Sequence, residues 1–98
     1  GSAQTLHYGA AKSALETVTL GLSKSGAKYN ILVNTVRGGF IDTPMHQKLG
    51  RANIEKRIEM IPLKRAGKPQ DVAGMVLFLA SEAGDFITGE TFTVAGGD

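Results

Sequence analysis

The chain has 98 residues, with eleven Lys and Arg against nine Asp and Glu, and 42% of its residues are hydrophobic. This length allows one domain at most, and the small positive excess gives little support for a nucleic-acid partner. The absence of cysteine and of any run of about eighteen apolar residues excludes disulfides, thiolate chemistry and a membrane span, and suits a cytoplasmic protein.

The first residues, Gly1 and Ser2, are not preceded by Met, and this pattern is typical of a scar left by tag cleavage. We therefore interpret Ala3 as the first native residue. Residues 3–98 are predicted to form a single partial domain rather than a complete enzyme. No internal repeat, low-complexity tract or linker divides them.

The first predicted element is a helix from Tyr8 to Lys28, because apolar residues recur there at spacings of three and four. This apolar stripe consists of Ala11, Leu15, Val18 and Leu22. A ridge of small residues runs beside it and consists of Ala10, Ala14, Thr17 and Gly21. Either the helix simply covers a sheet, or the ridge also forms an interface between subunits. Gly26 predicts the end of the helix.

Tyr8 and Lys12 lie four residues apart at the head of this helix, so both occupy one face, one turn apart. A free phenol has a pKa near about 10 and transfers protons poorly at neutral pH, whereas a nearby ammonium favours the phenolate and lowers that pKa. Such a pair suits proton transfer to a carbonyl oxygen, or from an alcohol, as hydride moves. By chance alone, however, Tyr and Lys at this spacing are more often surface neighbours.

The run Ile31–Val36 is short, mostly apolar and β-branched, which predicts a parallel strand buried on both faces. Residues 37–39 break this run with two glycines. The loop that follows leaves the carboxyl end of the strand, where open α/β sheets bind ligands. The Thr43 hydroxyl and the backbone around Ile41 are candidate contacts to a flat ligand. A plain strand-to-helix turn is the alternative.

Residues 46–68 carry seven of the eleven basic residues, and a short helix is predicted near Asn53–Met60. The segment is either a lid that attracts an anionic substrate group or a solvated face. His7 and His46 have no neighbouring metal-ligand pattern, so we interpret both as ordinary histidines and predict no metal site.

Residues 67–71 predict the start of another helix, with Pro69 in its first turn and Asp71 near the positive end of its dipole. The predicted buried face of this helix consists of Val72, Met75, Val76, Leu79 and Ala80. Residues 81–84 end the helix. Thr91–Val94 then alternates as a final strand.

The order of helix, strand, glycine loop, basic segment, helix and strand resembles the C-terminal half of a classical short-chain dehydrogenase/reductase. It most resembles the branch of bacterial ketoacyl carrier-protein reductases and of sugar- or steroid-alcohol dehydrogenases. The blocks that carry the resemblance are Tyr8–Lys12, Val33–Met45, Pro62–Ala73, Phe78–Ser81 and Ile87–Gly97. The fold that this implies is α/β: two strands and three to four helices from the C-terminal part of a Rossmann-like doubly wound parallel sheet, without the half that binds the dinucleotide phosphates.

The resemblance implies an NAD(P)-dependent oxidoreductase that moves hydride between a carbonyl and an alcohol. Tyr8 would be the general acid/base, and Lys12 would favour its phenolate form while bonding to the nicotinamide ribose. Gly39, Ile41 and Thr43 would complete the cofactor-binding set by holding the nicotinamide carboxamide. The resemblance also implies NAD or NADP as cofactor, a small carbonyl or alcohol substrate, a mobile lid after the loop, and a homo-oligomer formed through the first helix.

Two residues depart from the family pattern: Gly38 stands where Pro is usual, and Ala95 stands where Asp is common. The glycine-rich phosphate turn and the catalytic Ser and Asn of the family lie outside these 98 residues. We therefore expect the chain to be inactive alone. The alternative is a non-catalytic remnant that acts only as an oligomeric packing module.

Overall fold

The computed structural model describes residues 3–98, so Gly1 and Ser2, which we interpreted as a tag scar, lie outside the described residues. The elements in chain order are α1 (Ala3–Ala27), β1 (Thr35–Gly38), η1 (His46–Leu49), α2 (Arg51–Glu59), α3 (Pro69–Ala80), η2 (Glu82–Gly84) and β2 (Thr91–Val94). β1 and β2 pair in parallel, with Thr35 opposite Thr91 and Gly38 opposite Val94. The predicted α/β class is confirmed.

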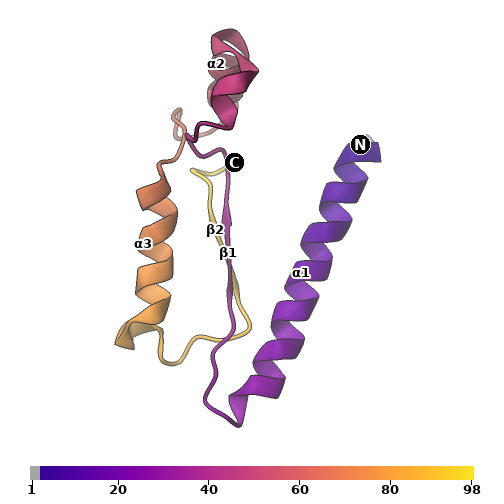
Figure 1. Cartoon of the computed structure of the whole chain (residues 1–98), viewed down its shortest axis with the longest axis vertical. Coiled ribbons are helices and arrows are strands. Elements are labelled where there is room, and N and C mark those ends of the chain that lie inside the picture. The colour runs from indigo at the N-terminus through magenta and orange to yellow at the C-terminus, as the bar shows by residue number, and fades with distance from the viewer. Residues whose placement is uncertain (1–2) are drawn as a thin grey trace.

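The two strands lie between α1 on one side and α3 on the other, so the chain has three layers (Figure 1). Side chains alternate along a strand, and each strand therefore gives every second residue to each helix. Thr35 contacts Thr19 of α1. Arg37 contacts Glu16 of the same helix. Val36, between them, faces α3.

The bounds of the predicted strand Ile31–Val36 were wrong, because β1 spans Thr35–Gly38. The residues before β1 are joined to the neighbouring segment by one backbone hydrogen bond, from the Gly89 N–H to the Val33 carbonyl at 2.7 Å, and otherwise by side chains. The Asn34 side chain donates a hydrogen bond to the Ile87 carbonyl at 3.0 Å and accepts one from the Glu90 N–H at 3.1 Å. β1 also includes Arg37 and Gly38, which we expected to end the strand.

α1 begins at Ala3, so Tyr8 lies inside this helix rather than at its head. The helix ends at Ala27, one residue after Gly26, and the left-handed turn beyond it is made by Asn30, with φ of 58°. The Ile31 N–H closes the turn by donating to the Gly26 carbonyl at 3.0 Å.

α1 presents a polar face to the sheet. Thr19 and Ser23 are buried, whereas Leu15, Val18 and Leu22 of the apolar stripe are 49%, 53% and 54% exposed. α1 does cover the sheet, as one of the two interpretations expected, but it packs there through Thr19 and Ser23 rather than through the apolar stripe. Ala11 and Leu15 of the stripe line a shallow pocket together with Arg37 of β1, and Val18 and Leu22 are exposed.

The core is small, with buried apolar side chains at Phe40 and Ile61. Two residues of the predicted buried face of α3, Val76 and Ala80, are exposed. The Cα radius of gyration is 15.8 Å, against about 13 Å for a compact domain of 100 residues. Much apolar surface is thus left uncovered. No helix within residues 3–98 is long and apolar enough to cross a membrane.

Candidate active site

An open groove of about 450 Å³ lies between the N-terminal half of α1 and the end of the sheet. Its lining residues are Tyr8, Lys12, Arg37, Gly38, Gly39, Phe40, His46, Arg57, Thr93, Ala95 and Asp98. Tyr8 and Lys12 form the helical wall of this groove, and Gly39 lies on the wall made by the end of β1. Three of the residues singled out from the sequence therefore share one groove.

The helical wall presents a phenol and an ammonium to the same space. Tyr8 is 69% exposed, and Lys12 is half-buried. Because they are one turn apart on one face, both groups can reach a single bound molecule. Lys12 has no ion-pair partner within the described part of the chain.

α1 is fastened to β1 by polar contacts that follow Lys12 along the helix. Arg37 donates from Nη1 to Glu16 Oε1 at 3.0 Å, and these side chains are 21% and 46% exposed. Farther along, the hydroxyls of Thr19 and Thr35 lie 2.5 Å apart in a buried contact. These contacts set the face of α1 that is turned toward the sheet.

Gly39 forms the opposite wall where the two strands end. Its N–H donates to the Val94 carbonyl at 3.0 Å. A Cβ at this position would lie 2.6 Å from the Ala95 Cβ and 2.9 Å from the Ala95 Cα. Only glycine fits such a close approach without movement of the backbone. Gly38 is less confined, because its nearest contact from a Cβ would be 3.1 Å.

Ile41 does not line the groove, and its backbone forms a parallel bridge to Gly67. In this bridge the Gly67 N–H donates to the Phe40 carbonyl at 2.9 Å, and the Asp42 N–H donates to the Gly67 carbonyl at 2.7 Å. Parallel bridges use the groups on either side of the paired residue. The N–H and C=O of Ile41 itself therefore point away from Gly67.

His46 joins the two predicted cofactor contacts of this loop, Ile41 and Thr43. Its Nδ1 lies 2.7 Å from the Ile41 carbonyl oxygen and 3.2 Å from the Thr43 hydroxyl. A carbonyl oxygen can only accept, so Nδ1 carries a proton and donates it. The ring also packs on Phe40, with centroids 4.6 Å apart. His46 thus braces the loop, which the sequence did not predict. Thr43, like Ile41, lies outside the groove lining.

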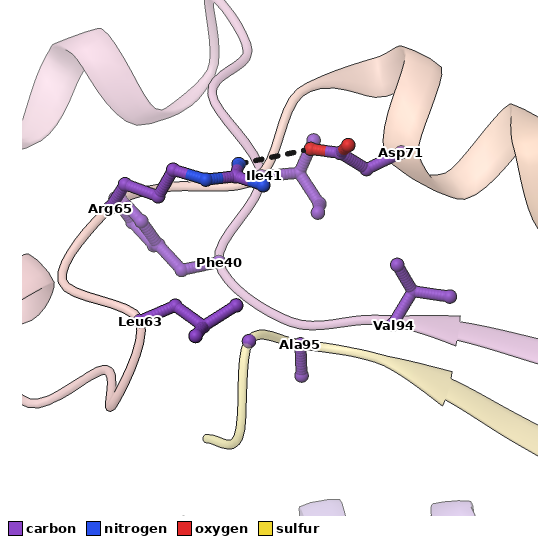
Figure 2. A pocket seen from close by; sticks show the side chains of 9 residues that line it. Phe40, Ile41, Leu63, Arg65, Asp71, Val94 and Ala95 are labelled. Atoms are coloured by element: carbon purple, nitrogen blue, oxygen red, sulfur yellow. Dashed lines mark hydrogen bonds and ion pairs between the residues drawn. The ribbon is translucent and has the colours of Figure 1, made fainter.

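A second pocket of about 190 Å³ lies on the α3 side of the same loop. Figure 2 shows the Arg65–Asp71 ion pair next to Ile41 at this pocket, with a separation of 3.1 Å. The Asp71 carboxylate also accepts a hydrogen bond from the Lys68 N–H at 2.8 Å. The Lys68 hydrogen bond, and then that from Arg65, hold the pKa of Asp71 below its ordinary value of 3.8. This charged pair holds the segment 65–68, whose Gly67 forms the bridge to Ile41 of the loop.

The basic segment 46–68 contributes one arginine to the groove. Arg57 lies over the Phe40 ring at 5.4 Å and pairs with Asp98. The lysines of this segment are exposed and consist of Lys48, Lys56, Lys64 and Lys68. A solvated face therefore describes most of the segment. No group of three or more His, Asp or Glu side chains within residues 3–98 could hold a metal ion.

Sequence reasoning missed Arg37, His46 and Arg57 as groove residues. A signal existed for His46, because it stands three residues after Thr43 in the loop that leaves a strand. The sequence pattern assigns Arg37 to the break after the strand, and its position on the α1 face follows only from the observed strand bounds. Arg57 lies in a different predicted element from Phe40, and only the fold brings its guanidinium over that ring.

The family profile described as Enoyl-(Acyl carrier protein) reductase matches residues 1–98. The 3-oxoacyl-(acyl-carrier-protein) reductase FabG of Aquifex aeolicus is 43% identical over 97 residues, which cover 99% of this chain and 39% of that protein. A short-chain dehydrogenase/reductase structure from Brucella melitensis matches with a TM-score of 0.84 and 41% identity, over 99% of this chain and 39% of that chain. The NADPH-dependent reductase YwfH matches with a TM-score of 0.80 and 32% identity, over 87% of this chain and 36% of that chain.

The chain belongs to the short-chain dehydrogenase/reductase family, and it corresponds to the C-terminal part of the Rossmann fold of that family. Within the family it is homologous to the 3-oxoacyl-(acyl-carrier-protein) reductases. The chain spans 39% of the length of the FabG relative from Aquifex aeolicus.

Proposed function

We propose that this chain is the proton-transfer part of an NAD(P)-dependent oxidoreductase that interconverts a carbonyl and an alcohol. The observation that carries the proposal is the presence of the Tyr8 phenol, the Lys12 ammonium and the backbone of Gly39 in one groove. The similarity to FabG, a 3-oxoacyl reductase, and to YwfH, an NADPH-dependent reductase, supports this chemistry and this class of cofactor.

The donors and acceptors around the groove fit the nicotinamide riboside end of such a cofactor. The Lys12 ammonium has three N–H donors for ribose hydroxyls, and Tyr8 stands one turn from it. Gly39 keeps its part of the wall free of a side chain. The Ile41 carbonyl has two lone pairs, so it can accept a hydrogen bond from a carboxamide while it accepts one from His46. Thr43 would offer its hydroxyl to the same carboxamide.

The residues of the chain then act on a proton. The bound cofactor supplies or takes the hydride. In reduction, the Tyr8 hydroxyl donates its proton to the substrate oxygen as negative charge develops there, and the Lys12 ammonium stabilises the phenolate that remains. In oxidation, the Tyr8 phenolate accepts the proton of the alcohol. The substrate class is a small carbonyl or alcohol compound.

The test needs the upstream segment that the relatives possess, because the chain covers 39% of FabG. Residues 3–98 are therefore placed in FabG of Aquifex aeolicus in place of the corresponding part, and this protein is called the completed reductase. It should oxidise NADPH or NADH in the presence of a 3-oxoacyl thioester. Nicotinamide fluorescence of the 98-residue chain alone, at millimolar cofactor, is measured in parallel. Cofactor binding by the completed reductase without turnover would contradict the proposal.

A second candidate function is an oligomeric packing module, and the apolar stripe of α1 favours it. Leu15, Val18 and Leu22 are each about half exposed, and a large exposed apolar surface marks an interaction site. We propose that this stripe binds a second copy of the chain, whether the chain acts as part of a reductase or only as a packing module. Val18→Glu should lower the mass observed by light scattering. Leu77→Glu, at a site that is 70% exposed on α3, is the matched control and should not change it.

A further inference from the structure

Lys12 lies between two partners on α1. Tyr8 precedes it by one turn and Glu16 follows it by one turn, so all three side chains lie on one face of the helix. An ammonium at this position is attracted to the Glu16 carboxylate as a normal i, i+4 neighbour. If Lys12 paired with Glu16, its charge would move away from Tyr8 and from the groove.

The structure shows a different pairing. Glu16 accepts a hydrogen bond from Arg37 of β1 at 3.0 Å. Asp98, the acidic residue in the groove lining, is likewise paired with an arginine, Arg57. Glu16 and Asp98 thus both have arginine partners. Lys12 has no carboxylate partner among residues 3–98.

Arg37 and Arg57 hold these two carboxylates better than lysines would. A guanidinium keeps its charge at every physiological pH and offers several donors in a fixed plane, so it competes well for a carboxylate. Arg37 is 21% exposed, and its charge is less screened by water than that of a fully exposed side chain. The Glu16 carboxylate is therefore held by Arg37 of β1.

We propose that Arg37 is a positioning residue that acts through Glu16: by holding this carboxylate, it prevents Glu16 from capturing Lys12 and leaves the ammonium directed at Tyr8 and the groove. The inference rests on the proposed function, because it concerns the availability of Lys12 for proton transfer. It differs from a purely mechanical role, in which the Arg37–Glu16 contact would only hold α1 against β1.

The two roles predict different results for a double substitution. In Arg37→Met, Glu16 loses its partner and captures Lys12, so kcat of the completed reductase should fall by roughly twofold to fivefold, the upper part of the range expected of a partly screened ion pair. In Arg37→Met with Glu16→Gln, no carboxylate remains to capture Lys12, and kcat should return to within about twofold of Glu16→Gln alone. If the Arg37–Glu16 contact were only mechanical, Arg37→Met and the double variant would break it equally, and kcat would not recover in the double variant.

The measurements are kcat and KM of four proteins: the unchanged completed reductase, Glu16→Gln, Arg37→Met and the double variant, each with its thermal midpoint. Recovery in the double variant supports the proposal. A double variant as slow as Arg37→Met, or an Arg37→Met variant with unchanged kcat, would overturn it. If Arg37→Met does not fold, Arg37→Gln replaces it and is tested with and without Glu16→Gln in the same way.

Tyr8→Phe separates this inference from the proposed function. If Tyr8→Phe keeps full turnover, the proposed function is wrong and the inference falls with it. If Tyr8→Phe is inactive and the double variant does not recover, only the inference is wrong. In the 98-residue chain, the side-chain nitrogen of Lys12 followed by NMR should shift on Arg37→Met and return on adding Glu16→Gln.

Discussion

The two walls of the groove are held in different ways. The wall formed by the loop after β1 is fixed on several sides, by the bridge to Gly67, by His46 and by the close approach of Gly39 to Ala95. The α1 wall is fixed only from Glu16 onward, and Tyr8 is 69% exposed. The wall proposed to hold the nicotinamide carboxamide is therefore the more firmly fixed of the two. Within residues 3–98, the hydrogen bonds and ion pair that join α1 to β1 begin at Glu16, beyond Tyr8 and Lys12.

The largest expected effect is at Tyr8. In the completed reductase, Tyr8→Phe removes the proposed acid and should lower kcat by about 10²-fold to 10⁴-fold, the usual contribution of a general acid. Cofactor affinity should change little, because the ring remains. Stopped-flow turnover and fluorescence titration measure the two quantities. Turnover that survives the substitution would show that the proton comes from another group.

A substitution at Gly39 tests how firmly the loop wall is fixed. Gly39→Ala places a Cβ 2.6 Å from the Ala95 Cβ, so the strand ends must separate. Such overpacking costs about 1–3 kcal/mol, and the thermal midpoint of the completed reductase should fall. Gly74→Ala in α3 is the control, since nothing lies within 4 Å of the added carbon, and it should leave the midpoint equal or higher. An equal fall in both variants would mean that the wall is not tightly packed.

Substitutions of His46 test whether the loop after β1 must be held in place for the cofactor to bind. His46→Ala removes the donor to Ile41 and should raise KM for NADPH by about tenfold, the cost of roughly one neutral hydrogen bond and its ordering, with a smaller change in kcat. His46→Asn places an amide near the position of Nδ1 and should restore most of the affinity. If Asn and Ala behave alike, the ring is needed for its stacking on Phe40 rather than for its N–H.

The smallest effect concerns Asp71, which holds the segment 65–68 at the start of α3. Its folded-state pKa is lowered, so its carboxylate stabilises the fold at neutral pH, and this contribution is lost as the pH falls below 3.8 and through the lower folded value. Asp71→Asn should therefore lower the thermal midpoint at pH 7, and the difference from the unchanged protein should shrink toward pH 3. If the difference in thermal midpoint between Asp71→Asn and the unchanged protein did not depend on pH, the effect would come from altered packing or hydrogen bonding rather than from the lost charge.

The sequence predicts where helices and strands lie along the chain better than it predicts which side of each one packs against its neighbours. Thr91–Val94 and the start of α3 at Pro69 lie where the pattern placed them, because alternation and helix-start residues are local signals. Ile31–Val36 has strong strand propensity, yet β1 starts at Thr35 because the Asn34 side chain takes the bonding groups of the neighbouring segment. A side chain that bonds across fifty-three positions leaves no periodic signal.

The lining of the groove follows from the sequence only in part, for the same reason. Tyr8 and Lys12 are a local pair on one helix, so their shared face follows from spacing alone. The contribution of Arg37 depends on which strand face it occupies, and that of His46 depends on a loop that turns back on itself. That α1 covers the sheet follows from its pattern, but the pattern does not show that Thr19 and Ser23 are the residues that pack there.

The position of the nicotinamide ring tests the proposed site most directly. In the completed reductase saturated with oxidised cofactor, nuclear Overhauser contacts from the nicotinamide ring protons should reach both the Tyr8 ring and the Gly39 Hα, which line opposite walls of one groove. A bound cofactor whose nicotinamide protons contact neither residue would contradict the proposed site, whatever the turnover of the protein.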